Sequence, residues 1–199
     1  MINKNHQSSI HTKFISGKKD IVFIGLNATA EAVKVQSVFC TRAGFWNILR
    51  DAGFISDFKK DIKLQYPYQQ MAHEVFVTGS LVARKESLGF TDIVDNSAIT
   101  TTNSAQVTVT AAHLKSLGNR LASCSPNKIV LLGKRVAEEF VKLDPKLAAI
   151  FKQKKNSPNA QCYDYLGDTL IGGKLTKVYV MPFPETSPIK DKAGFYKKI

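Results

Sequence analysis

The sequence predicts an α/β fold, a three-layer α/β/α sandwich around a short, mostly parallel central sheet. Short apolar runs rich in β-branched residues, typical of strands buried on both faces, alternate with segments whose apolar residues recur every three or four positions, as in helices. At 199 residues and 44% hydrophobic composition, the chain is also long enough to bury one full core. We therefore expect a single domain over 20–199, preceded by a basic N-terminal arm over 1–19.

The first expected strand is the apolar run at 21–24, which is bounded by an aspartate and a glycine. A helix is expected from Phe45, because apolar residues recur at helical spacing until Gly53, a residue type that often ends helices. Phe45 and Trp46 lie on the apolar face of that helix. We therefore expect both side chains in the core.

The later segments repeat this alternation. Helical spacing over 107–122 predicts a second helix, and the apolar run at 128–132 predicts a second strand that leads through a Gly-Lys pair into a third helix. A third strand is expected at 177–181. The segment 156–176, with a proline and a pair of glycines, is expected to be a loop with a short hairpin.

The composition favours an intracellular protein with an anionic partner. The formal net charge is +12, from 28 basic and 16 acidic residues, which suits nucleic acid. Three cysteines, odd in number and far apart, suggest neither a disulfide framework nor a metal site. No run reaches the roughly 18 apolar residues that span a membrane, and the first 19 residues lack the apolar core of a signal peptide. We expect a cytoplasmic protein without a membrane partner.

Three strand ends are expected to form one cleft. In a parallel sheet the carboxyl ends of the strands open onto one edge, which would bring together Asn27, the Gly133-Lys134 turn and the segment after Met181. A glycine before a helix leaves the backbone N–H groups of the first helical turn free to bind a phosphate, and the positive charge of Lys134 would strengthen such a phosphate-binding site. The alternative, that Gly133 only serves a strand-to-helix turn, remains open.

Several short motifs follow one another along the chain. They are Gly25-Leu26-Asn27, Phe39, Gly44-Phe45-Trp46, Gly89-Phe90-Thr91-Asp92-Ile93-Val94, Leu132-Gly133-Lys134 and Val180-Met181-Pro182. In this order and at these separations they resemble the uracil-DNA glycosylase superfamily, most closely its mismatch-specific uracil and thymine-DNA glycosylases. The resemblance covers roughly residues 21–187 and rests on the order and spacing of the motifs rather than on any one of them.

The resemblance implies a DNA glycosylase that flips a damaged or mismatched base out of double-stranded DNA and hydrolyses its N-glycosidic bond. It implies that Asn27 positions the attacking water and that Leu26, Ala28 and Phe39 bind the base. We expect a monomer without metal or cofactor. The residues expected to contact DNA lie in two loops and are Gly133, Lys134, Pro182, Phe183, Pro184, Thr186 and Ser187.

The chain departs from the pattern of this branch at three places. Ala28-Thr29 follows Asn27 where Pro-Gly is usual, Phe183-Pro184-Glu185 stands where small serines are usual, and Ala43-Gly44 replaces an asparagine. Other interpretations therefore remain. Phe39 is alternatively a core residue, and the protein is alternatively a weak or inactive DNA-binding member of the fold, or a small-molecule nucleoside hydrolase.

Overall fold

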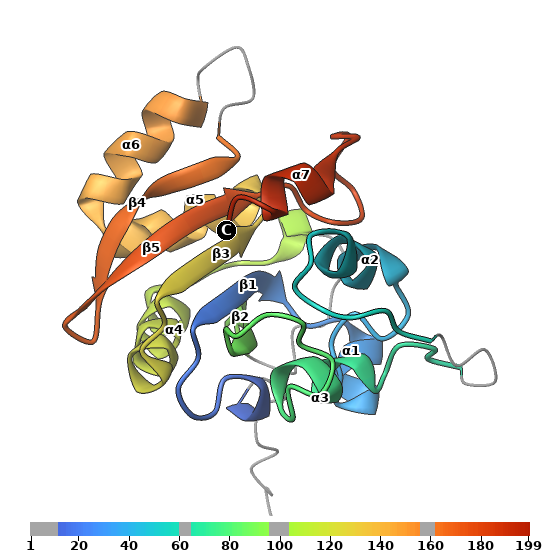
Figure 1. The fold of residues 1–199 in the computed structure, drawn as a ribbon. Coiled ribbons are helices and arrows are strands. Elements are labelled where there is room, and N and C mark those ends of the chain that lie inside the picture. The colour runs from blue at the N-terminus through green and yellow to red at the C-terminus, as the bar shows by residue number, and fades with distance from the viewer. Residues whose placement is uncertain (1–11, 60–64, 96–103, 156–161) are drawn as a thin grey trace, which may run out of the picture.

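The computed structural model describes residues 12–59, 65–95, 104–155 and 162–199. Five strands form one sheet in the order β2-β1-β3-β5-β4 (Figure 1). β4 is antiparallel to β5, and the other neighbouring pairs are parallel. The strands are β1 (Ile21–Asn27), β2 (Leu88–Val94), β3 (Lys128–Leu132), β4 (Asp164–Ile171) and β5 (Lys174–Met181).

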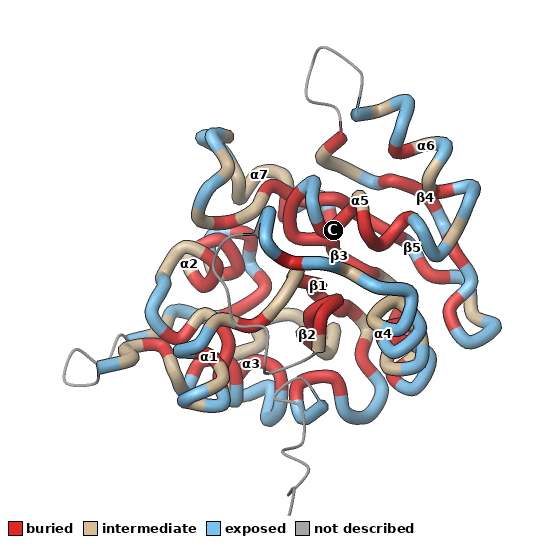
Figure 2. The backbone as a smooth tube through the Cα atoms, turned by 180° about the vertical axis from the view of Figure 1, so that it is seen from behind, coloured by how far each residue is buried: buried red, intermediate tan, exposed pale blue. Residues whose placement is uncertain are grey.

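Helices cover both faces of the sheet. The first hydrophobic cluster holds buried residues of α1 (Ala30–Val35), α2 (Ala43–Asp51), α3 (Met71–Phe76) and α7 (Lys192–Tyr196). The second holds those of α4 (Ala111–Cys124), α5 (Lys134–Phe140) and α6 (Pro145–Lys155). In Figure 2 the central strands are mostly buried, and exposed residues gather on the outer sides of helices such as α4. The predicted three-layer sandwich is confirmed.

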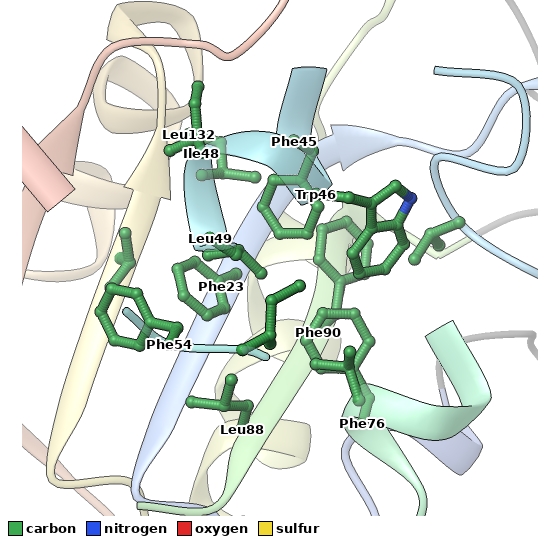
Figure 3. Close-up of a cluster of buried hydrophobic side chains, with 14 of the residues drawn as sticks. Phe23, Phe45, Trp46, Ile48, Leu49, Phe54, Phe76, Leu88, Phe90 and Leu132 are labelled. Atoms are coloured by element: carbon green, nitrogen blue, oxygen red, sulfur yellow. The ribbon is translucent and has the colours of Figure 1, made fainter. Parts of the chain in front are cut away.

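The strands contribute side chains to the two clusters in alternation. Phe23 lies in the first cluster, whereas its neighbours Val22 and Ile24 lie in the second. Successive side chains of a strand point to opposite faces, so a strand between two helical layers is apolar throughout. Phe45 and Trp46 of α2 pack onto the first face near Phe23 (Figure 3). Both are fully buried, which confirms the expectation for this helix.

The end of α2 shows why local sequence predicted it well. Gly53 has a φ of 77°, a conformation that glycine adopts without steric cost. Its N–H bonds the carbonyl of Arg50, and the N–H of Phe54 bonds the carbonyl of Leu49. This pair of bonds is the Schellman motif, which satisfies the last carbonyl groups of a helix.

One strand, β2, was not predicted. It contains Gly89, Thr91 and Asp92, which interrupt the apolar pattern of a buried strand although all of its residues are buried. β4 lies in the segment expected to be a loop with a short hairpin. The hairpin is present and turns at Gly172-Gly173, but β4 is an eight-residue strand and therefore longer than expected. Its burial alternates along much of its length because it lies at the edge of the sheet. The first part of the expected loop, 156–161, lies outside the described residues.

Some expected boundaries are also corrected. α4 begins at Ala111, not at 107, because Thr110 caps it by accepting the N–H of His113. In the segment 12–19, Phe14 lies in the first cluster and Ile15 in the second, whereas residues 1–11 of the expected arm lie outside the described part. The three cysteines are free and buried. Within the described residues, no helix is long and apolar enough to cross a membrane.

Candidate functional site

One pocket lies at the carboxyl ends of β1, β3 and β5 and has a volume of about 480 Å³. Residues that follow or end all three strands line it, among them Asn27, Gly133 and Phe183. The parallel pairing of β1 with β3 and of β3 with β5 brings these ends to one edge of the sheet. The expected convergence of the three loops is therefore present.

Asn27 is the last residue of β1 and not the first residue after it, because the strand continues beyond Ile24 and pairs with β2 as far as Val94. The side chain is half-buried and lines the pocket. Its Nδ2 donates a 3.0 Å hydrogen bond to the carbonyl of Ala28. That bond orients the amide and assigns Oδ1 as its acceptor end.

Phe39 lines the same pocket from the segment between α1 and α2. Its ring stacks on that of Phe45, with centroids 4.2 Å apart and an interplanar angle of 20°. Its carbonyl accepts a 3.1 Å hydrogen bond from the indole N–H of Trp46, and its φ is 50°. Packing thus holds an unusual backbone conformation in place. The rings of Phe90 and Trp46 also contact Phe39 edge-to-face, so Phe39 packs against the core and at the same time lines the pocket.

Leu26 and Ala28 line the pocket on either side of Asn27. Leu26 is half-buried, and Ala28 is 6% exposed. Directly after them, the hydroxyl of Thr29 accepts the N–H of Ala32 at 3.2 Å and caps α1. The Ala28-Thr29 pair therefore begins a helix at the end of the strand.

Gly133 lines the pocket, but its own N–H is not a free phosphate donor. This N–H donates to the carbonyl of Met181 at 2.8 Å. A φ of 99° makes glycine necessary at the turn, which supports the interpretation of Gly133 as a strand-to-helix turn. Any phosphate-binding site at this turn has to use the backbone N–H groups of the residues after Gly133. Lys134 is exposed at the pocket, and its Nζ lies 5.7 Å from the ring centre of Tyr163.

The two prolines of the loop after β5 support the loop rather than lining the pocket. Pro182 is buried, and its carbonyl accepts a 3.1 Å hydrogen bond from the hydroxyl of Tyr196. Pro184 is also buried, and its carbonyl accepts a 2.6 Å hydrogen bond from Nζ of Lys192. Both partners belong to α7, so this helix holds the loop against the domain.

The other predicted residues of this loop do line the pocket. Phe183 is half-buried and packs against Gly133. A Cβ added to Gly133 would lie 3.3 Å from the Cβ of Phe183. Phe183 therefore forms part of the pocket wall in this structure. Thr186 is exposed and Ser187 is half-buried, so Thr186 is the more accessible of the two hydroxyl groups.

Asp92 is a pocket residue that the sequence reasoning did not single out as a site residue. It is 3% exposed and lines the pocket from β2, paired in register with Gly25 of β1. A Cβ on Gly25 would lie 2.1 Å from Oδ1 of Asp92, so the missing side chain makes room for the carboxyl. A carboxylate inside an otherwise buried strand was the available signal, but it required that β2 be recognised.

Burial raises the pKa of Asp92 to about 8. The positive charge of Arg120 opposes this shift, whereas the charge of Asp95 adds to it. Arg120 is an ion-pair partner of Asp95 at 2.9 Å, and it also donates to the backbone carbonyl of Asp92 at 2.7 Å. The charge of Arg120 thus acts on both carboxyl groups but does not outweigh burial at Asp92, which keeps its proton at neutral pH.

Glu185 is a second pocket residue missing from the predicted site. It is half-buried, lines the pocket and directs its carboxylate against Gly44 of α2. Within the described part of the chain, its Oε1 is buried without a hydrogen-bond partner. The departure from the usual small serines in this loop was the sequence signal for it.

The fold and pocket define a class of α/β proteins that bind a ligand at the carboxyl ends of parallel strands. The family model of the Uracil DNA glycosylase superfamily matches the chain over residues 12–198. The protein belongs to this superfamily, as the sequence motifs indicated. A comparison with curated proteins finds no match. The mismatch-specific branch stays a prediction.

Proposed function

We propose that the protein is a DNA glycosylase of the mismatch-specific type that excises uracil or a related mismatched or damaged base. The observation that carries this proposal is that the Asn27 amide and the Phe39 ring line one pocket. Its volume, about 480 Å³, falls in the range of roughly 300–1,000 Å³ typical of small-ligand sites. Membership of the superfamily supports the same reaction class.

In this mechanism the target nucleotide leaves the base stack and its base enters the pocket. The base stacks on the ring of Phe39 and contacts Leu26 and Ala28, which line the same pocket. Oδ1 of Asn27 accepts a hydrogen bond from the attacking water and orients it toward the sugar carbon. Orientation of this kind lowers the barrier without a change in the charge of the amide.

Exposed cations at the pocket mouth suit the phosphates of the DNA. Arg42 and Lys134 are both exposed, and both line the pocket. The hydroxyl of Thr186 lies on the same rim and can donate to a phosphate oxygen. Together with a net charge of +12, this arrangement favours DNA over a neutral small molecule as the partner.

A base-release assay tests the proposal. Duplexes carrying uracil, thymine opposite guanine, hypoxanthine or ethenocytosine are incubated with the protein and then cleaved with alkali at abasic sites. We expect strand scission on at least one of them and a loss of about 100-fold or more in Asn27→Ala, because the water loses its orientation. The matched control is Asn119→Ala, at an exposed position of α4 away from the pocket. Folded protein that cleaves none of the duplexes contradicts the proposal.

A DNA-binding protein without catalysis is the second candidate. The observation that favours it is the Ala28-Thr29 pair, which begins α1 directly after Asn27. Tight duplex binding that Asn27→Ala leaves unchanged, with no base release, would support this candidate. Turnover of free deoxyuridine without affinity for DNA would instead indicate a nucleoside hydrolase.

A further inference from the structure

The proposed reaction needs a group that takes a proton. As the water oxygen bonds to the sugar carbon, the bond between that carbon and the base nitrogen breaks, and its electron pair leaves with the base. The water must also lose a proton. The amide of Asn27 orients the water but does not take up a proton at neutral pH. The pocket therefore has to offer another acceptor.

Most titratable groups in the described pocket lining are poor acceptors. Asp92 already carries a proton, because burial raises its pKa to about 8. Burial also raises the pKa of the Cys40 thiol and of the Tyr163 hydroxyl, which leaves both in the neutral form. Arg42 and Lys134 are cations. Glu185 is the remaining carboxyl group.

The Glu185 carboxylate sits against the N-terminal turn of α2. An added Cβ on Gly44 would lie 2.4 Å from Oε1, 2.7 Å from Cδ and 3.0 Å from Oε2 of Glu185. The carboxylate thus occupies the space of a side chain at position 44. Gly44 is the second residue of α2, and its missing side chain leaves the room that the carboxylate occupies.

The helix end also favours a negative charge. The N-cap residue of α2, Arg42, makes no side-chain capping bond, and the first turn contains no acidic residue. The positive end of the helix dipole therefore faces the Glu185 carboxylate without competition from an acid of its own. Oε1 nevertheless has no hydrogen-bond partner among the described residues. A buried acceptor left unsatisfied costs roughly 1–3 kcal/mol, so its presence in a native structure calls for an explanation, of which a catalytic role is one.

We propose that Glu185, held against Gly44, accepts the proton of the attacking water that Asn27 orients. This inference rests on the proposed glycosylase function. The products of the step are the abasic sugar, the base that leaves with the bonding electron pair, and a protonated Glu185 that returns its proton to the solvent or to the base. Glu185 comes from the loop after β5, and Asn27 from the end of β1. The two residues therefore act from different walls of one pocket.

Single-turnover base release tests the inference with the wild type, Glu185→Gln and Glu185→Asp, across a range of pH. Glu185→Gln keeps the size of the side chain but is a far weaker proton acceptor. We expect it to lose about 100- to 1,000-fold in rate, within the usual range for general-base catalysis. The rise of the rate with pH at the acidic end of the profile should disappear. Glu185→Asp should restore part of the rate and this rise.

Gly44→Ala tests the position of the carboxylate without altering it chemically. The new methyl group has to displace the carboxylate, whereas alanine itself suits the helix. We expect a folded protein with a rate at least tenfold lower than that of the wild type. Thermal unfolding of each variant verifies that it is folded.

The possible failures are distinguishable. A wild type without base release on any duplex contradicts the proposed function itself. An active wild type whose Glu185→Gln variant stays within threefold of its rate, or keeps the acidic limb of the profile, contradicts the role of Glu185. A Gly44→Ala variant with the full rate contradicts the proposal that the position of the Glu185 carboxylate against Gly44 matters for catalysis.

Discussion

At the scale of single residues, the pocket lining contains residues that the sequence motifs predicted and residues that they did not predict. Asn27 and Phe39 stand out because an amide at a strand end and an isolated aromatic belong to recognisable motifs. Asp92 and Glu185 were not predicted because each depends on a glycine that is close in space but distant in the chain. Gly25 leaves room for the carboxyl group of Asp92, and Gly44 leaves room for that of Glu185. A glycine in a strand or helix thus marks an approach by a residue far away in the chain.

The raised pKa of Asp92 predicts a pH-dependent stability. The carboxyl has an ordinary value of 3.8 in the unfolded chain and of about 8 in the folded one. Between these values the folded state holds a proton that the unfolded state has lost. The free energy of unfolding should therefore fall as the pH rises through this window, by up to about 1.4 kcal/mol per pH unit, and level off above it.

Urea unfolding of the wild type and Asp92→Asn at several pH values between 4 and 9 (about one unit apart) measures this dependence. The amide has the shape of the protonated carboxyl and does not titrate, so the variant should show a shallower decline. Asp95 is still present in the variant, and burial raises its pKa as well, so the free energy of unfolding of the variant should still fall with pH, but less steeply. Parallel curves for the two proteins would contradict the assignment.

At the scale of elements, the pairing of β1 with β2 brings Gly25 and Asp92 together in the pocket lining. Gly25 and Asp92 are register partners, so the two strands place the missing side chain and the carboxyl side by side. β2 was missed because a glycine, a threonine and an aspartate interrupt its apolar pattern. The Asp92 carboxyl is buried at the pocket, so the tertiary environment of β2 outweighs the low strand propensity of aspartate.

Gly25→Ala should destabilise the protein by about 1–3 kcal/mol, because its methyl group meets the buried carboxyl and has no space to enter. The matched control is Gly118→Ala in α4, where an added Cβ meets nothing within 4 Å. That variant should gain up to about 1 kcal/mol from helix propensity. Chemical denaturation of both variants measures the difference, and equal effects would argue against the packing of β1 against Asp92.

At the scale of the whole molecule, charge complements the pocket. A net charge of +12 suits a polyanionic partner such as DNA, and we expect the cations at the pocket rim, Arg42 and Lys134, to contact its phosphates. Lys134 is exposed at the pocket mouth and near Tyr163. We therefore predict that Lys134 contributes one phosphate contact to duplex binding.

Lys134→Gln should weaken duplex binding and reduce the dependence of the logarithm of the affinity on the logarithm of the salt concentration by about 1, the effect of one lost phosphate contact. Lys115→Gln is the control, since Lys115 is exposed on α4 and does not line the pocket. Fluorescence anisotropy at several salt concentrations measures both slopes. Identical slopes for Lys134→Gln and the wild type would show that this lysine does not contact phosphate.

The sequence by itself determined the features that depend on local pattern. The apolar runs of β1 and β3, the helical spacing of α2 and its end at Gly53 follow from neighbouring residues. The order of the motifs indicated the superfamily, and the strand ends indicated where the pocket lies. These signals suffice because hydrophobic periodicity and helix capping act over a few residues.

Only the tertiary structure decided which side chains meet in that pocket. Asp92 faces Gly25 through strand pairing, and Glu185 reaches Gly44 from a loop that α7 supports. The N–H of Gly133 donates a hydrogen bond to the carbonyl of Met181 at the end of β5, whereas the sequence had suggested that it binds phosphate. Burial and close approach depend on segments far apart in the chain, so no local pattern reports them.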